Sequence, residues 1–150
     1  MVARILVWRL CMTEICISFG MIMDKKSVFS EEAPKPIGPY SQAVSAGGFL
    51  WCSGQIPIDP KTGKTIGETA AQQAEQVLKN LKAVLIAGGA SMEQVVRTGI
   101  FLSDLDDFAA VNEVYARYFP GEAAPARSTV EVSSLPRDVK VEIEAVAFLG

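Results

Sequence analysis

In two stretches near the end of the chain, residues 125–132 and 139–147, charged or polar side chains alternate with mostly apolar ones. This pattern predicts strands with one buried face. The link between them, residues 133–138, is short, so we expect the two strands to be neighbours in one sheet. Arg127 and Glu142 would then be displayed together on one rigid face. On spacing alone, solvated charges on an outward face are the simpler interpretation.

Composition limits the chemistry that the chain can perform. It has 150 residues, enough for one domain with its own core, and a net charge of −3 with no basic run that would suit nucleic acid. It has no histidine and only three cysteines, Cys11, Cys16 and Cys52, which predicts neither a metal site nor a disulfide framework. We therefore expect no cofactor, and acid–base chemistry from carboxylates, tyrosine, lysine, backbone groups or water.

Residues 1–22 differ from the rest, because they are apolar but interrupted by two arginines and a glutamate. A membrane-spanning helix needs about 20 mainly apolar residues, and a secretory signal needs an uninterrupted apolar core. We expect neither. Our hypothesis is that 1–22 is a poorly ordered leader or a mis-annotated start, with translation beginning at Met23 or Met21 and one domain at 23–150. We expect a cytoplasmic protein, with organellar targeting by 1–22 as the alternative.

The order of the predicted elements defines the fold class. Expected in sequence are a hairpin at 41–53, a helix at 69–87, a strand at 95–102, a helix at 104–119 and the two final strands. This order predicts an α+β fold in which two helices cover one face of a mixed β-sheet. The other face would pack against further subunits in a closed symmetric ring, and Arg127 and Glu142 would lie on it.

Three further residues are candidates with equally simple structural interpretations. Tyr40 follows two prolines and a glycine that stiffen residues 36–39, and it could be a functional phenol or a loop aromatic that caps the core. Gly54 allows either a special backbone angle or the close approach of a ligand. Asn112 lies beside the apolar stripe of the second helix, where asparagine is usually solvated.

Five segments carry a resemblance to a known family: 37–42 (IGPYSQ), 52–57 (CSGQIP), 107–112 (DFAAVN), 125–132 (PARSTVEV) and 135–145 (LPRDVKVEIEA). From about Met23 to its end, the chain resembles the RidA/YjgF family of reactive-intermediate imine deaminases. The resemblance implies a chorismate-mutase-like (YjgF-like) single domain and a homotrimer with active sites in the clefts between subunits. It also implies cofactor-free hydrolysis of 2-imino and 2-enamino acids, such as 2-iminobutanoate and 2-iminopropanoate, to 2-oxo acids and ammonia, which protects pyridoxal-phosphate enzymes.

The resemblance also implies roles for individual residues. Arg127 would clamp the substrate carboxylate, Glu142 would orient and polarise the attacking water, and Tyr40 would lie near the leaving nitrogen. Substrate-binding roles fall on Ser53, Gly54, Asn112 and Thr129. The family often has cysteine where this chain has Thr129; since the implied role belongs to the backbone, we expect threonine to be tolerated.

Two alternatives remain at the level of sequence. One is a non-catalytic small-ligand-binding or chaperone-like member of the same fold, against which the presence of both Arg127 and Glu142 argues. The other is RNA cleavage or translation inhibition, against which the acidic composition argues. We expect a small-molecule substrate, and neither nucleic acid nor membrane as partner.

Overall fold

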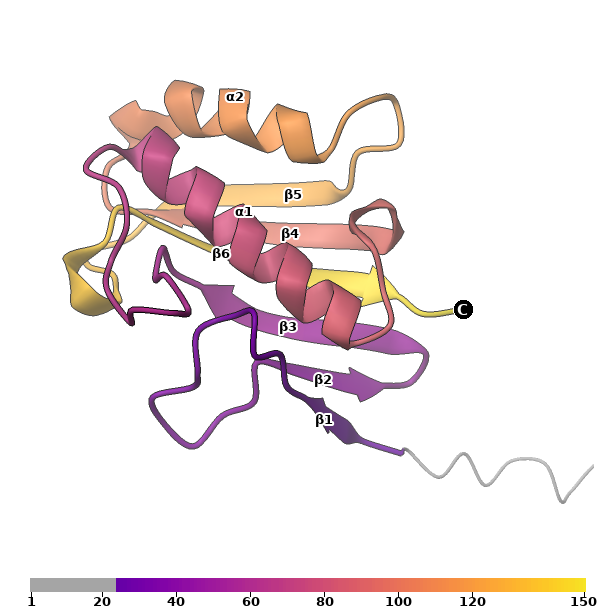
Figure 1. The fold of residues 1–150 in the computed structure, drawn as a ribbon. Helices are drawn as coiled ribbons and strands as arrows, with labels where there is room; N and C mark the ends of the chain where they lie inside the picture. Colours follow the sequence, from indigo (N-terminus) through magenta and orange to yellow (C-terminus); the bar gives the residue numbers. More distant parts are fainter. Residues whose placement is uncertain (1–23) are drawn as a thin grey trace, which may run out of the picture.

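The computed structural model describes residues 24–150, so the hypothesis for residues 1–22 lies outside the described part of the chain. A six-stranded sheet has the order β1-β2-β3-β6-β4-β5, and two helices lie against one of its faces (Figure 1). The elements are β1 (Lys26–Val28), β2 (Ala43–Ala46), β3 (Phe49–Gln55), α1 (Ala70–Ala87), β4 (Val95–Leu102), α2 (Phe108–Tyr118), β5 (Ala126–Glu131) and β6 (Val141–Phe148). The expected α+β fold, a mixed sheet with two helices on one face, is confirmed.

Helix α1 forms where the sequence predicts it because both ends carry specific signals. Thr69 Oγ1 accepts a hydrogen bond from the Gln72 N–H at 3.3 Å, and Gln72 Oε1 accepts one from the Thr69 N–H at 3.2 Å, which completes a capping box. The helix stops at Gly88, and Gly89 adopts a φ of 80° that glycine favours. One stripe of α1 is buried against β3 and β6: Ala74, Val77, Leu78, Leu81, Val84 and Leu85.

The final two strands are not neighbours, and this prediction is wrong. Strand β4 lies between them, parallel to β5 and antiparallel to β6. The parallel pair is possible because α2 provides the long crossover between β4 and β5. The link from β5 to β6 passes the end of β4, where the Val132 N–H donates to the Leu102 carbonyl at 2.9 Å. A short link therefore spans one intervening strand.

Arg127 and Glu142 lie on opposite faces of the sheet, which corrects a second prediction. Arg127 is in register with Thr98, a fully buried residue on the helix-covered side. Glu142 is in register with Phe101 and lies between the buried Val141 and Ile143, so it points to the other side.

The face without helices, here called the open face, is largely apolar. Trp51, Phe148 and Val130 are 52%, 47% and 45% exposed. The Phe49 ring contacts both neighbours, with centroids 6.3 Å from Trp51 and 5.4 Å from Phe148. Exposed apolar side chains gathered on one face in this way usually mark an interface.

Strand β1 was not predicted from the sequence. It lies in the polar segment before Lys35 and pairs with β2 at the edge of the sheet. With three residues, Lys-Ser-Val, it is too short for an alternating pattern to show.

Gly88→Ala tests how tightly α1 packs on the sheet. Alanine suits the backbone angles of Gly88 (φ −83°, ψ 1°), but a Cβ there would overlap the Leu50 side chain. We expect the free energy of unfolding to fall by about 1–3 kcal/mol in urea titrations. Combined with Leu50→Val, which makes room, the loss should be smaller than the sum of the two single losses. Strict additivity would contradict this contact.

Candidate active site

Glu142 projects from β6 over a gap in the pairing of β3 with β6. The register of these strands shifts between Cys52 and Gln55, which leaves Ser53 and Gly54 in an irregular segment. A Cβ on Gly54 would overlap the Glu142 carboxylate. Of the two roles that the sequence allows for Gly54, the structure therefore supports close approach, here to the Glu142 side chain.

The surroundings of Glu142 favour its protonated form. The side chain is half-buried, and burial raises the pKa of its carboxyl; the nearby Glu144 raises it further. Within residues 24–150 no basic side chain forms a salt bridge with Glu142, whereas Arg97 Nη1 lies 3.9 Å from Glu144 Oε1. A carboxylate with a raised pKa is a better proton acceptor from water than an ordinary one.

Ser53 lies in β3 next to Gly54, and Tyr40 lies on a loop that one buried side chain holds. Gln42 donates to the carbonyls of Ser30 and Pro34 at 3.1 and 2.9 Å, which fixes the segment on either side of Tyr40. Tyr40 and Gly54 line the same cavity of about 30 Å³. Ser53 Oγ donates to the Ser41 carbonyl at 2.7 Å. Tyr40, Ser53, Gly54 and Glu142 form one group, here called the Glu142 cluster.

Arg127 belongs to a second group, on the other face of the sheet. Its guanidinium carbon lies 4.7 Å from the centre of the Tyr115 ring and 5.6 Å from that of Phe108, and Nη1 donates to Asn112 Oδ1 at 2.7 Å. Asn112 thus orients an arginine instead of being merely solvated. Thr129 follows on the same face of β5. Asn112, Arg127 and Thr129 are here called the Arg127 cluster.

The structure therefore brings the predicted site residues together in two groups and not in one. A single chain presents its guanidinium on the helix-covered side and its glutamate on the open face. Tyr115 and Phe108 were predicted only as members of the apolar stripe of α2. Their spacing carries no sign of the arginine that lies over them.

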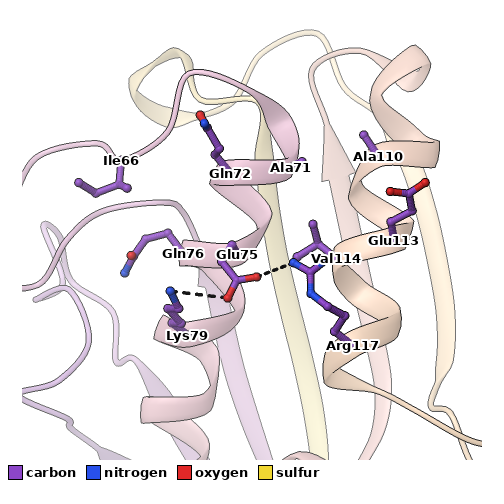
Figure 2. A pocket seen from close by; sticks show the side chains of 10 residues that line it. All are labelled: Ile66, Ala71, Gln72, Glu75, Gln76, Lys79, Ala110, Glu113, Val114 and Arg117. Carbon is purple, nitrogen blue, oxygen red and sulfur yellow. Dashed lines mark hydrogen bonds and ion pairs between the residues drawn. The ribbon is translucent and has the colours of Figure 1, made fainter.

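A larger surface groove of about 590 Å³ lies between α1 and α2, and none of the predicted site residues lines it (Figure 2). Its central charge is already paired: Glu75 accepts from Arg117 Nη2 at 2.8 Å and from the Tyr118 hydroxyl at 2.7 Å, and Lys79 lies 3.6 Å away. These bonds lower the pKa of Glu75, the Tyr118 bond most strongly. The groove lies where α1 and α2 meet, and the charge of Glu75 at its centre is already paired with Arg117 and Lys79.

Within residues 24–150, no group of three metal-ligating side chains could hold an ion, and no helix is long and apolar enough to cross a bilayer. Cys52 is buried, which raises the pKa of its thiol to about 12. It stays protonated at neutral pH, so it cannot act as a nucleophile.

Comparisons with known proteins match most of the chain. A family model described as Endoribonuclease L-PSP matches residues 30–149. A RutC family protein of Pyrococcus horikoshii is 56% identical over 124 residues, which is 83% of this chain and 98% of that protein. A protein of Salmonella typhimurium named 2-iminobutanoate/2-iminopropanoate deaminase is 49% identical over 124 residues, covering 81% and 96% of the two chains. The crystal structure of the YjgF gene product of E. coli superposes with a TM-score of 0.77 at 48% identity, covering 82% and 98%.

The fold is that of a small α+β protein, and its candidate site residues lie at a sheet edge and on an open sheet face. The chain belongs to the RidA/YjgF family, the family that the Endoribonuclease L-PSP model describes.

Glu142→Gln tests the environment of the carboxyl through the pH dependence of stability. With its pKa raised in the folded state, Glu142 stabilises the fold as pH falls through that pKa and destabilises it as pH rises. The variant should therefore unfold at higher urea than wild type at neutral pH, and the difference should vanish below about pH 4, where both side chains are neutral. Glu122→Gln, in an exposed loop, is the control. A variant less stable than wild type at neutral pH would contradict this description.

Thr129→Val tests what the Thr129 hydroxyl contributes to stability, while the backbone groups of this residue stay in place. The hydroxyl is buried and has no hydrogen-bond partner among residues 24–150. Valine should raise the free energy of unfolding by about 1 kcal/mol, because a buried polar atom without a partner is costly. Thr98→Val is the matched control and should be destabilising, since the Thr98 hydroxyl is bonded to Tyr115. Equal losses in both variants would show that the Thr129 hydroxyl is satisfied.

Proposed function

We propose that the chain hydrolyses 2-imino acids and their 2-enamino tautomers, such as 2-iminobutanoate and 2-iminopropanoate, to 2-oxo acids and ammonia. The observation that carries the proposal is the fixed guanidinium of Arg127. It is stacked on Tyr115 and bonded to Asn112 through one nitrogen, yet it is exposed, and its other N–H donors have no partner among residues 24–150. A planar, oriented fork of this kind recognises a carboxylate with two parallel hydrogen bonds. The relative from Salmonella typhimurium, with its deaminase name, supports the same substrate class.

The proposed reaction needs only a positioned water and a proton acceptor. Arg127 holds the substrate carboxylate, which places the carbon of the protonated imine next to Glu142 of a neighbouring subunit. As water attacks that carbon, Glu142 accepts one of its protons, and a neutral carbinolamine forms. Glu142 then gives this proton to the amino nitrogen. As the carbon–nitrogen bond breaks, the hydroxyl proton of the carbinolamine passes back to Glu142, and ammonia and the 2-oxo acid leave. Tyr40 hydrogen-bonds the departing nitrogen, Ser53 lines the pocket, and the main chain at Gly54 and Thr129 binds water and carboxylate.

We propose that the complete site forms between subunits of a homotrimer. Since the two clusters lie on opposite faces of one sheet, a single chain cannot direct both onto one small substrate. Strand β5, which carries Arg127, is at the sheet edge, and the open face displays Trp51, Val130 and Phe148. Burying those side chains against neighbouring copies would drive assembly and bring the edge of one subunit to the Glu142 cluster of the next.

The cellular role that follows is protection of pyridoxal-phosphate enzymes from reactive imines, which we place in the cytoplasm. RNA cleavage is not supported in the same way, although the description of the family model names an endoribonuclease. Binding an RNA backbone depends on clustered basic side chains, and the chain carries a net charge of −3.

Arg127→Ala is the direct test of the carboxylate anchor. An amino-acid oxidase generates 2-iminobutanoate, semicarbazide traps it, and the protein competes with the trap. Wild type should lower semicarbazone formation, and Arg127→Ala should lose about 3 kcal/mol of transition-state binding, roughly 100-fold in kcat/KM. The oligomer should persist, because the substitution removes the carboxylate anchor but none of the exposed apolar side chains of the open face.

Arg117→Ala serves as the control, since Arg117 lies in the groove between the helices, among none of the site residues. It should leave the rate unchanged. A wild-type oligomer without activity would point to ligand binding alone, and an Arg127→Ala variant of normal rate would remove Arg127 from the site.

A further inference from the structure

Tyr115 lies directly under the guanidinium of Arg127 and is only 5% exposed. Its hydroxyl forms a buried 2.8 Å hydrogen bond with Thr98 Oγ1. The ring of Phe119 packs against it, with centroids 4.5 Å apart. The ring is thus fixed both by a hydrogen bond and by a second aromatic side chain.

The contacts close a triangle across three elements. Thr98 on β4 is the register partner of Arg127 on β5, Thr98 is bonded to Tyr115 on α2, and Tyr115 stacks on Arg127. A core position on α2 could be filled by any apolar side chain of similar size. A tyrosine whose hydroxyl reaches the residue beside Arg127 instead ties the plane of the ring to the strand that carries the arginine.

The stack and the Asn112 bond constrain different motions of the guanidinium. The ring face fixes the plane of the fork, and the bond from Nη1 to Asn112 Oδ1 fixes its rotation within that plane. Burial raises the pKa of the Tyr115 hydroxyl, so the phenol stays neutral at physiological pH. The attraction between the neutral ring and the guanidinium is therefore of the cation–π type.

We infer that Tyr115 is a positioning residue for carboxylate recognition, and that the Thr98 hydroxyl holds Tyr115 in the orientation that Arg127 requires. The inference rests on the proposed role of Arg127 as carboxylate anchor. A free arginine side chain must lose its rotamer freedom when it binds a carboxylate, whereas a guanidinium fixed beforehand loses little. Tyr115 should thus affect substrate affinity more than the chemical step.

The test uses the full chain and two readouts, steady-state hydrolysis of 2-iminobutanoate and calorimetric binding of 2-oxobutanoate. Tyr115→Leu removes the ring and should raise KM and the Kd for 2-oxobutanoate by about tenfold, with kcat changed by less than about threefold. Tyr115→Phe and Thr98→Val keep the ring but remove its hydrogen bond, and each should raise both constants by roughly two- to fivefold. These two milder variants carry the test if Tyr115→Leu does not fold.

A second background distinguishes positioning from mere structural support. Arg127→Lys keeps the charge but has no planar fork to stack. In that background the Tyr115 and Thr98 substitutions should change KM and Kd by less than about twofold, because the group they position is absent. If each substitution has the same effect in both backgrounds, Tyr115 only supports the fold and the inference is overturned.

The binding readout separates this inference from the proposed function. If wild type binds 2-oxobutanoate with the predicted dependence on Tyr115 but does not hydrolyse the imine, the inference holds and the deaminase proposal fails. If wild type hydrolyses the imine and the Tyr115 effect is independent of Arg127, the deaminase proposal holds and the inference about Tyr115 fails. If it neither hydrolyses nor binds, both are overturned.

Discussion

The position of β4 between β5 and β6 is the constraint on which the rest of the site depends. The parallel pairing of β4 with β5 sets Arg127 beside Thr98 on the helix-covered side, and the antiparallel pairing with β6 sets Glu142 beside Phe101 on the open face. Because side chains alternate strictly along a strand, a register shift of one residue would exchange these faces. In the proposed mechanism, the sheet thus separates the half of the site that binds the carboxylate from the half that accepts the proton.

The same open face links two properties that would otherwise be unrelated. Its exposed Trp51, Val130 and Phe148 favour association, and Glu142, whose pKa is raised by burial and by Glu144, projects from the same face. In the proposed trimer, assembly would complete the site by bringing Arg127 of one subunit to Glu142 of the next. The Arg127 half differs, since its guanidinium is already oriented within one chain by Tyr115 and Asn112.

Much of the fold could be predicted, because strong local signals determine it. The helix expected at 69–87 and the hairpin expected at 41–53 lie where the sequence placed them, as α1 and as the pair of β2 and β3. The strand order could not be predicted in this way, since alternation says nothing about which strand lies alongside. Alternation of apolar and polar side chains also cannot tell which face of a strand the helices cover when both faces carry apolar residues. Val130 is an example, since it is apolar but lies on the open face. The site residues were found through family motifs, and Tyr115 was missed because helical spacing identifies a buried residue but not its contact with Arg127.

Complementation between two inactive variants tests most directly whether the site forms between subunits. Arg127→Ala and Glu142→Gln would be denatured, mixed in equal amounts and refolded together, with each refolded alone as the control. If each site takes Arg127 from one subunit and Glu142 from its neighbour, random mixing should restore about a quarter of wild-type imine hydrolysis. If both residues act within one chain, no mixed assembly contains a complete site. Failure to regain activity in demonstrably mixed oligomers would contradict the account.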